Sequence, residues 1–115
     1  MTLKDLAAKA GLVPIQDQGD LEVLVGGGYT GDLLSDVMGR AAGRSVWITC
    51  QVHENIVAVA KLKNLAAIIL VNGRTPDPAV VKRAREERVL IFGTPAPAFE
   101  VSAALQALLA GPKDR

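Results

Sequence analysis

Short runs of aliphatic residues alternate along this chain with longer stretches in which apolar and polar residues recur at helical spacing. The runs predict strands over residues 21–25, 45–50, 67–71 and 89–92. The stretches predict helices over residues 3–10, 31–42, 54–64, 78–88 and 98–110, with a polar connector over residues 14–20. Because strands that alternate with helices are typical of parallel sheets, the pattern predicts an α/β fold: a three-layer sandwich with a mainly parallel sheet of about four or five strands flanked by helices.

The apolar positions also predict which helix faces are buried. In the helix over residues 31–42, the expected buried stripe is Leu33, Leu34, Val37, Met38 and Ala41. In the last helix it is Phe99, Leu105, Leu108 and Leu109. The run from Ile56 to Ala60 is apolar over too wide an arc for a helix with one buried stripe, so a second surface must cover it. A dimer contact would do so, and so would a central position in the fold.

Composition excludes several classes of protein but does not indicate a partner. The chain has 115 residues, which is the size of a single domain over residues 1–115, and half of its residues are hydrophobic. Lys and Arg number 13 against 12 Asp and Glu, so charge gives no indication of a nucleic-acid partner. With one cysteine and one histidine, an internal disulfide and the common His/Cys metal sites are excluded. The apolar runs are too short to cross a membrane, which makes a cytoplasmic location the expectation.

The polar and glycine residues gather after the predicted strands. Since the carboxyl ends of parallel strands meet at one edge of a sheet, where ligands bind, we expect a binding site there. The candidate ligand-binding residues are Gly27, Gly28, Tyr29, Thr30, Asp32, Gln51, His53, Asn55, Asn72, Gly73, Arg74 and Thr94. Glycines followed by a helix N-terminus suit an anion, and the Arg74 guanidinium can pair with phosphate or carboxylate.

Each candidate also has a structural alternative. The glycines of residues 26–28 can form a tight turn, and Thr30 or Asp32 can cap the following helix. His53 and Asn55 can cap the helix after the second strand. Arg74 can be a solvated turn residue, and Thr94 can shape the turn before two prolines. The chain contains no GxxxxGK[ST] string, so a phosphate-binding P-loop is excluded.

Two arrangements could support catalysis. Cys50 and His53 lie close in sequence, and a histidine can activate a thiolate nucleophile. Asp32 and Asp36 lie one helical turn apart and could share a magnesium ion. No third group to orient His53 is evident, so we assign no catalytic residue, no resident metal and no cofactor, and expect a protein that is not an enzyme.

Four segments in the same order resemble a stand-alone DRTGG domain. They are GGGYTGDLLSDVMGRA (26–41), VWITCQVHENIVAVAKL (46–62), AAIILVNGRTPDP (66–78) and LIFGTPAPAFE (90–100). The family is distantly similar to the N-terminal domain of HPr kinase/phosphorylase, and related domains occur beside CBS domains in regulated pyrophosphatases. The resemblance implies an α/β regulatory or ligand-sensing module, often dimeric, with no catalysis of its own.

The leading hypothesis is therefore a regulatory domain that binds a small anionic ligand, such as a nucleotide, at the strand edge. It would act as a homodimer or through a partner protein. The alternatives are a small enzyme that uses Cys50 with His53, or Asp32 and Asp36 with magnesium, and a structural adaptor that binds partners through the apolar surface from Ile56 to Ala60.

Overall fold

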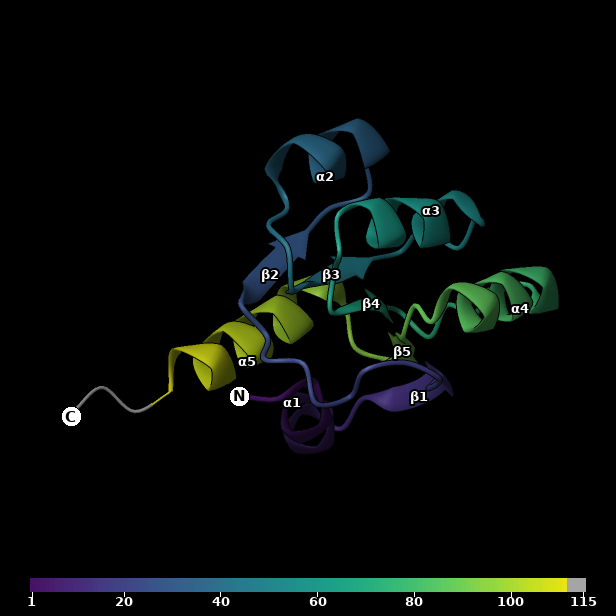
Figure 1. The fold of residues 1–115 in the computed structure, drawn as a ribbon. Coiled ribbons are helices and arrows are strands. Elements are labelled where there is room, and N and C mark those ends of the chain that lie inside the picture. Colours follow the sequence, from purple (N-terminus) through teal and green to yellow (C-terminus); the bar gives the residue numbers. More distant parts are fainter. Residues whose placement is uncertain (112–115) are drawn as a thin grey trace.

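A five-stranded sheet forms the middle layer of a three-layer α/β sandwich in the computed structural model, which describes residues 1–111 (Figure 1). The strands are β1 (Val13–Gln16), β2 (Gly27–Thr30), β3 (Ser45–Thr49), β4 (Ala67–Leu70) and β5 (Ile91–Gly93). Their order in the sheet is β1-β5-β4-β3-β2. The β2–β3, β3–β4 and β4–β5 pairs are parallel, and β1 is antiparallel to β5. The predicted fold class is confirmed.

Helices cover both faces of this sheet. They are α1 (Leu3–Ala10), α2 (Leu34–Arg40), α3 (Asn55–Leu62), α4 (Pro78–Glu87) and α5 (Ala98–Ala110). Figure 1 shows α1 and α5 on one side of the sheet and α2, α3 and α4 on the other. Each side has its own hydrophobic core cluster. Within residues 1–111, no helix combines the length and the apolar character that a membrane crossing requires.

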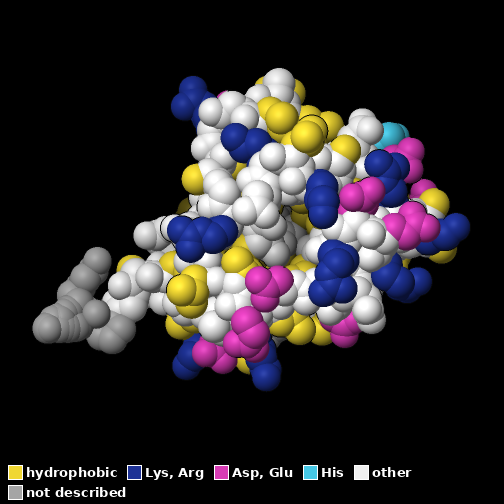
Figure 2. Space-filling view, in the orientation of Figure 1, with side chains coloured by type: hydrophobic (Ala, Val, Ile, Leu, Met, Phe, Trp, Pro, Cys, Tyr) yellow, Lys and Arg dark blue, Asp and Glu magenta, His cyan; other side chains and the backbone are white. Residues whose placement is uncertain are grey.

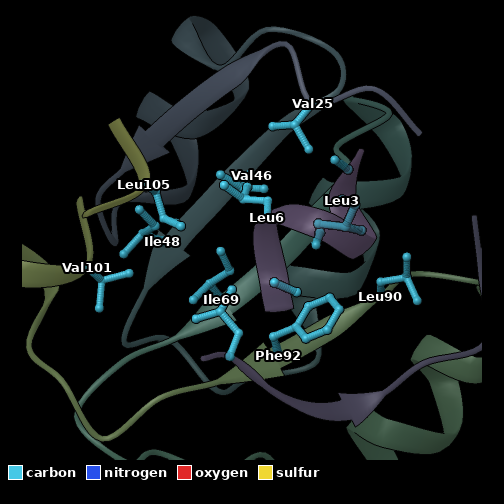
Figure 3. Packing of buried hydrophobic residues seen from close by; sticks show 14 of the residues in the cluster. Leu3, Leu6, Val25, Val46, Ile48, Ile69, Leu90, Phe92, Val101 and Leu105 are labelled. Carbon is cyan, nitrogen blue, oxygen red and sulfur yellow. The ribbon is translucent and has the colours of Figure 1, made fainter. Parts of the chain in front are cut away.

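The alternation of side chains along β3 divides the core in two. All five residues of β3 are buried. Val46 and Ile48 pack with Leu6 of α1 and Leu105 of α5 (Figure 3), whereas Trp47 belongs to the cluster under α2, α3 and α4. Because neighbouring side chains of a strand point to opposite faces, a strand covered on both sides is apolar throughout.

The apolar run of α3 is part of the core. Ile56 and Val57 are fully buried within this one chain, and Val59 and Ala60 are nearly so. The helix lies between α2 and α4 and packs on the sheet, so three neighbours cover the wide apolar arc. A central position in the fold, and not a dimer contact, explains the run.

The prediction of a strand over residues 21–25 is wrong. This segment runs beside the start of α1, where Val23 and Leu21 carbonyls accept hydrogen bonds from the Leu3 and Lys4 amides at 2.9 Å. The strand lies further on, at Gly27–Thr30, and pairs with residues 45–48 of β3. A glycine-rich sequence can form it because β2 is the edge strand of the sheet, where its backbone pairs on one side and few side chains need burial.

The predicted connector over residues 14–20 contains a strand instead. Pro14 lies within β1, the other edge strand, where a missing N–H is tolerated. Gln16 is buried, and its Nε2 donates to the Val89 carbonyl at 2.7 Å while its Oε1 accepts from the Gln18 amide at 2.7 Å. A buried glutamine with both ends satisfied ties β1 to the chain entering β5.

Three side chains expected in the core are exposed. Leu33 precedes the short α2 and is 68% exposed, Met38 lies on the outer side of that helix, and Phe99 in the first turn of α5 is 85% exposed. Val37, Ala41 and Leu105 are buried as predicted, while Leu34, Leu108 and Leu109 are partly buried against the core. In α2 only Val37 is buried, and Phe99 in the first turn of α5 borders a cavity instead of entering the core.

Candidate functional site

Asp32 lies at the carboxyl ends of β2 and β3 and joins the loops that follow them. Its Oδ1 accepts hydrogen bonds from the Thr49 hydroxyl at 2.7 Å and from the Cys50 amide at 2.9 Å. The Gln51 side-chain amide donates to the Asp32 carbonyl at 3.0 Å. The two hydrogen bonds to Oδ1, above all that from the Cys50 N–H, hold the pKa of Asp32 below its usual range. The structure thus brings Asp32 and Gln51 together, as predicted.

Trp47 sets the position of the loop that carries Asp32. The indole Nε1 donates to the Gly31 carbonyl at 2.8 Å, and the Gly31 amide donates to the Ile48 carbonyl at 3.1 Å. The tryptophan itself is fully buried on the α2–α4 side of the sheet. A rigid core residue therefore fixes the backbone next to the site. The sequence analysis did not include Trp47 or Thr49 among the site residues. The signal that could have indicated them is that each has a polar side-chain atom, although it lies in a strand predicted to be buried.

The turn after β4 is held by the loop after β5. Asn72 and Gly73 both have left-handed backbones, with φ of 59° and 67°. The Asn72 amide donates to the Ala96 carbonyl at 3.0 Å, and the Gly73 amide donates to the Thr94 carbonyl at 2.9 Å. The Thr94 hydroxyl accepts from the Ala96 amide at 3.2 Å. Three of the predicted site residues are therefore neighbours in a fixed arrangement.

Arg74 projects from this fixed turn. Within residues 1–111 its exposed guanidinium makes no hydrogen bond or ion pair. It borders a cavity of about 210 Å³ together with Gly73, Thr94 and the apolar side chains of Val13 and Ile15 in β1. Its positive charge also helps to lower the pKa of Asp32, although the hydrogen bonds to that carboxylate have the larger effect.

Charge is uneven along the strand edge. Of the loops that follow the parallel strands, only residues 71–77 carry a lysine or arginine, and there Arg74 is accompanied by Asp77. Asp32 and Glu54 carry negative charge near the ends of β2 and β3. Arg74, in the β4–β5 half of the edge, is therefore the cation of these loops with which an anion can pair.

His53 and Asn55 lie at the start of α3 and are exposed. The Asn55 amide donates to Nδ1 of His53 at 3.2 Å, so the histidine closes a local turn before the helix. The His53 side chain thus bonds the start of α3, in line with the structural alternative, whereas the N-cap residue is Glu54 and makes no side-chain capping bond. The second ring nitrogen, Nε2, makes no bond to any described residue and stays available to a ligand.

The expectation that Gly27, Gly28, Tyr29 and Thr30 follow a strand is wrong, because these residues form β2 itself. Neither glycine has a positive φ, so no tight turn is present. The Tyr29 hydroxyl donates to the Asp36 carboxylate on the α2 side. Gly28 and Thr30 line a cavity on the opposite face, under α5. Tyr29 is therefore on the opposite face of the sheet from Gly28 and Thr30, and β2 is separated from β4, which precedes Arg74, by β3.

The geometry does not favour either catalytic alternative. Burial, followed by the nearby Asp32 carboxylate, raises the pKa of the Cys50 thiol, which is the opposite of what a thiolate nucleophile needs. Asp32 accepts hydrogen bonds from Thr49 and Cys50. Asp36 instead accepts one from the Tyr29 hydroxyl and one from Arg40 Nε, the latter at 2.9 Å, so the two carboxylates have different partners. Over residues 1–111, no group of three or more His, Cys, Asp or Glu side chains is placed to hold a metal ion.

The chain matches no protein-family model and no curated protein. In structure it is similar to the CBS and DRTGG domains of the regulatory region of Clostridium perfringens pyrophosphatase, which was solved in complex with its activator, diadenosine tetraphosphate. The TM-score is 0.74 at 15% sequence identity. This chain has a CBS/DRTGG-like fold.

The match covers 91% of this chain and 46% of the pyrophosphatase region, so the chain spans less than half of that protein's length. At this identity the likeness establishes the fold, in agreement with the sequence resemblance. The more distant similarity to HPr kinase/phosphorylase stays a prediction.

Proposed function

We propose that this chain is a DRTGG-type regulatory domain that binds a small phosphate-bearing anion, such as a nucleotide, at the β4–β5 half of the strand edge. It carries out no reaction itself and passes the signal on through self-association or a partner protein. In this proposal Arg74 pairs with the phosphate, while Asn72, Gly73 and Thr94 hold the arginine in place and complete the site.

The observation that carries this proposal is the contrast between a rigid turn and a free cation. Two left-handed residues and two backbone hydrogen bonds fix the turn at Asn72 and Gly73, yet the Arg74 guanidinium has no partner within residues 1–111. The Thr94 hydroxyl accepts one hydrogen bond and keeps its own proton to donate. A cation on a fixed backbone turn and a hydroxyl donor beside a cavity are suited to binding an anion.

The likeness to a regulatory region supports the nucleotide class of ligand. That neighbour is a regulatory part of a pyrophosphatase and was solved with a dinucleotide activator. We carry over to this chain the general role, ligand sensing by a domain without an active site. The raised pKa of Cys50 supports the non-enzymatic part of the proposal.

Self-association has a suitable surface at the β2 edge. The outer side of β2 pairs with no strand of the described chain, and the exposed Leu33 and Met38 lie nearby in and before α2. Figure 2 shows hydrophobic side chains at the surface over α2, whereas positive and negative side chains are interspersed elsewhere on this face. An unpaired strand edge beside apolar side chains favours contact with another chain.

Replacing Arg74 by Gln should weaken binding of ATP by about tenfold to a hundredfold. A hydrogen bond to a charged group contributes about 1.5–3 kcal/mol, and about 1.4 kcal/mol corresponds to a tenfold change in affinity. Isothermal titration calorimetry with ATP measures the change. Arg85→Gln, at an exposed position of α4, removes the same charge away from the site and should leave the affinity unchanged. Equal affinity of the wild type and Arg74→Gln would refute the role of Arg74.

A further inference from the structure

A cavity of about 340 Å³ lies between α5 and the face of β2 and β3. Gly28 and Thr30 line it from β2, Val46 and Ile48 form its floor from β3, and residues 99–109 of α5 form the opposite wall. Its size falls in the range of small-molecule sites. It lies on the opposite side of β2 from Tyr29 and is distinct from the smaller cavity at Arg74.

The residues that line the cavity are suited to binding an uncharged ring. None of the described residues that line the cavity carries a charge, and most of them are apolar. Phe99 lines it while being 85% exposed, so an aromatic face stands at its mouth. The exposed phenylalanine ring has no aromatic partner among the residues that line the cavity. An aromatic ring of a ligand can stack on it.

Gly28 keeps the cavity open although packing does not demand a glycine there. A Cβ added at Gly28 would meet the nearest atom of the Val46 side chain at 3.5 Å, an ordinary contact distance. The backbone of Gly28 is also extended, so a side chain would fit its conformation. The missing side chain therefore leaves space over Val46 without relieving any clash.

Polar groups stand at one side of the same cavity. The hydroxyls of Thr30 and Ser102 are 2.7 Å apart and share one hydrogen bond, which leaves one proton and several lone pairs for a ligand. The exposed Gln106 side chain lines the cavity one turn further along α5 and offers both a donor and an acceptor. A planar ring with donors and acceptors at its edge matches this combination.

We propose that this cavity holds a nucleobase, stacked on Phe99 and hydrogen-bonded at its edge by Thr30, Ser102 and Gln106. The inference goes beyond the proposed function, because this cavity lies over β2 and β3 on the α5 side, whereas the cavity at Arg74 lies at the β1–β5 end of the sheet. A phosphate is unsuited to the cavity under α5, because no cation lines it.

Nucleosides without phosphate separate the two sites. Adenosine, guanosine, cytidine and uridine, and separately inorganic pyrophosphate, are titrated into the ¹⁵N-labelled full chain and followed by NMR. We expect at least one nucleoside to bind with shifts in residues 28–30 and 99–109. Ala103→Leu places a larger side chain into the cavity from an exposed position and should weaken that binding about tenfold or more. Phe99→Ala should do the same by removing the stacking partner.

Ala107→Leu is the matched control, because Ala107 is exposed on the same helix and does not line the cavity. It should leave nucleoside binding unchanged, and none of the three variants should affect pyrophosphate. Pyrophosphate binding without nucleoside binding would overturn the nucleobase site and leave the proposed function standing. Nucleoside affinity that is unchanged in both Ala103→Leu and Phe99→Ala would also overturn it. Binding of neither class of probe would refute both proposals.

Discussion

Replacing Val57 by Asp will unfold this protein instead of merely separating one copy from another. Val57 is fully buried within a single chain, in the cluster under α2, α3 and α4 that also contains Trp47. An aspartate there would be a buried charge without a partner, which costs several kcal/mol. Because domains of this size are stable by only about 5–15 kcal/mol, most of that stability would be lost.

Urea denaturation followed by circular dichroism measures this effect, and size-exclusion chromatography reports the association state. Leu62→Asp is the control, because Leu62 lies on the same helix and is 74% exposed. It should change the free energy of unfolding by no more than about 0.5 kcal/mol. A Val57→Asp variant that stays folded and loses only self-association would contradict the burial of α3 and restore the adaptor hypothesis.

Trp47→Ala should lower the free energy of unfolding by about 3–5 kcal/mol, the usual cost of removing a fully buried aromatic side chain. The variant also loses the hydrogen bond from Nε1 to the Gly31 carbonyl, next to Asp32. Since Trp47 is the only tryptophan, unfolding is followed by circular dichroism and not by fluorescence.

Trp47→Phe separates packing from the hydrogen bond. Phenylalanine keeps part of the ring in the cluster and removes the N–H, so we expect a smaller loss than for alanine. Equal losses for the two variants would mean that the hydrogen bond to Gly31, and not the volume of the indole, holds this part of the fold.

The sequence predicted the buried strands and most of the helices because their patterns reflect local burial. The apolar strand at residues 67–71 and the helix at residues 98–110 follow directly from such patterns. The prediction of a strand at residues 21–25 was wrong because an apolar segment that packs beside α1 has the same composition as a strand. The actual strand, Gly27–Thr30, has no aliphatic side chain. Pairing with β3 determines which residues form the strand, and a local sequence pattern does not show that contact.

The candidate site was predictable in part for the same reason. Knowing that loops meet at the carboxyl edge was enough to place Asp32 with Gln51, and Gly73 with Thr94. The sequence did not show on which face of β2 Gly28 and Thr30 lie, because the strand was predicted at residues 21–25 and these residues were expected in the loop after it. For Phe99, helical spacing indicated burial, but the side chain borders an open cavity between α5 and the sheet and is 85% exposed.

The most direct test of an anion site at Arg74 is to titrate the ¹⁵N-labelled chain with ATP and follow each backbone amide by NMR. If the anion binds at Arg74, the amides of Gly73, Arg74 and Thr94 will show saturable shifts in the wild type and none in Arg74→Gln. Saturable binding that leaves these three amides unmoved, or that persists unchanged in Arg74→Gln, would contradict it.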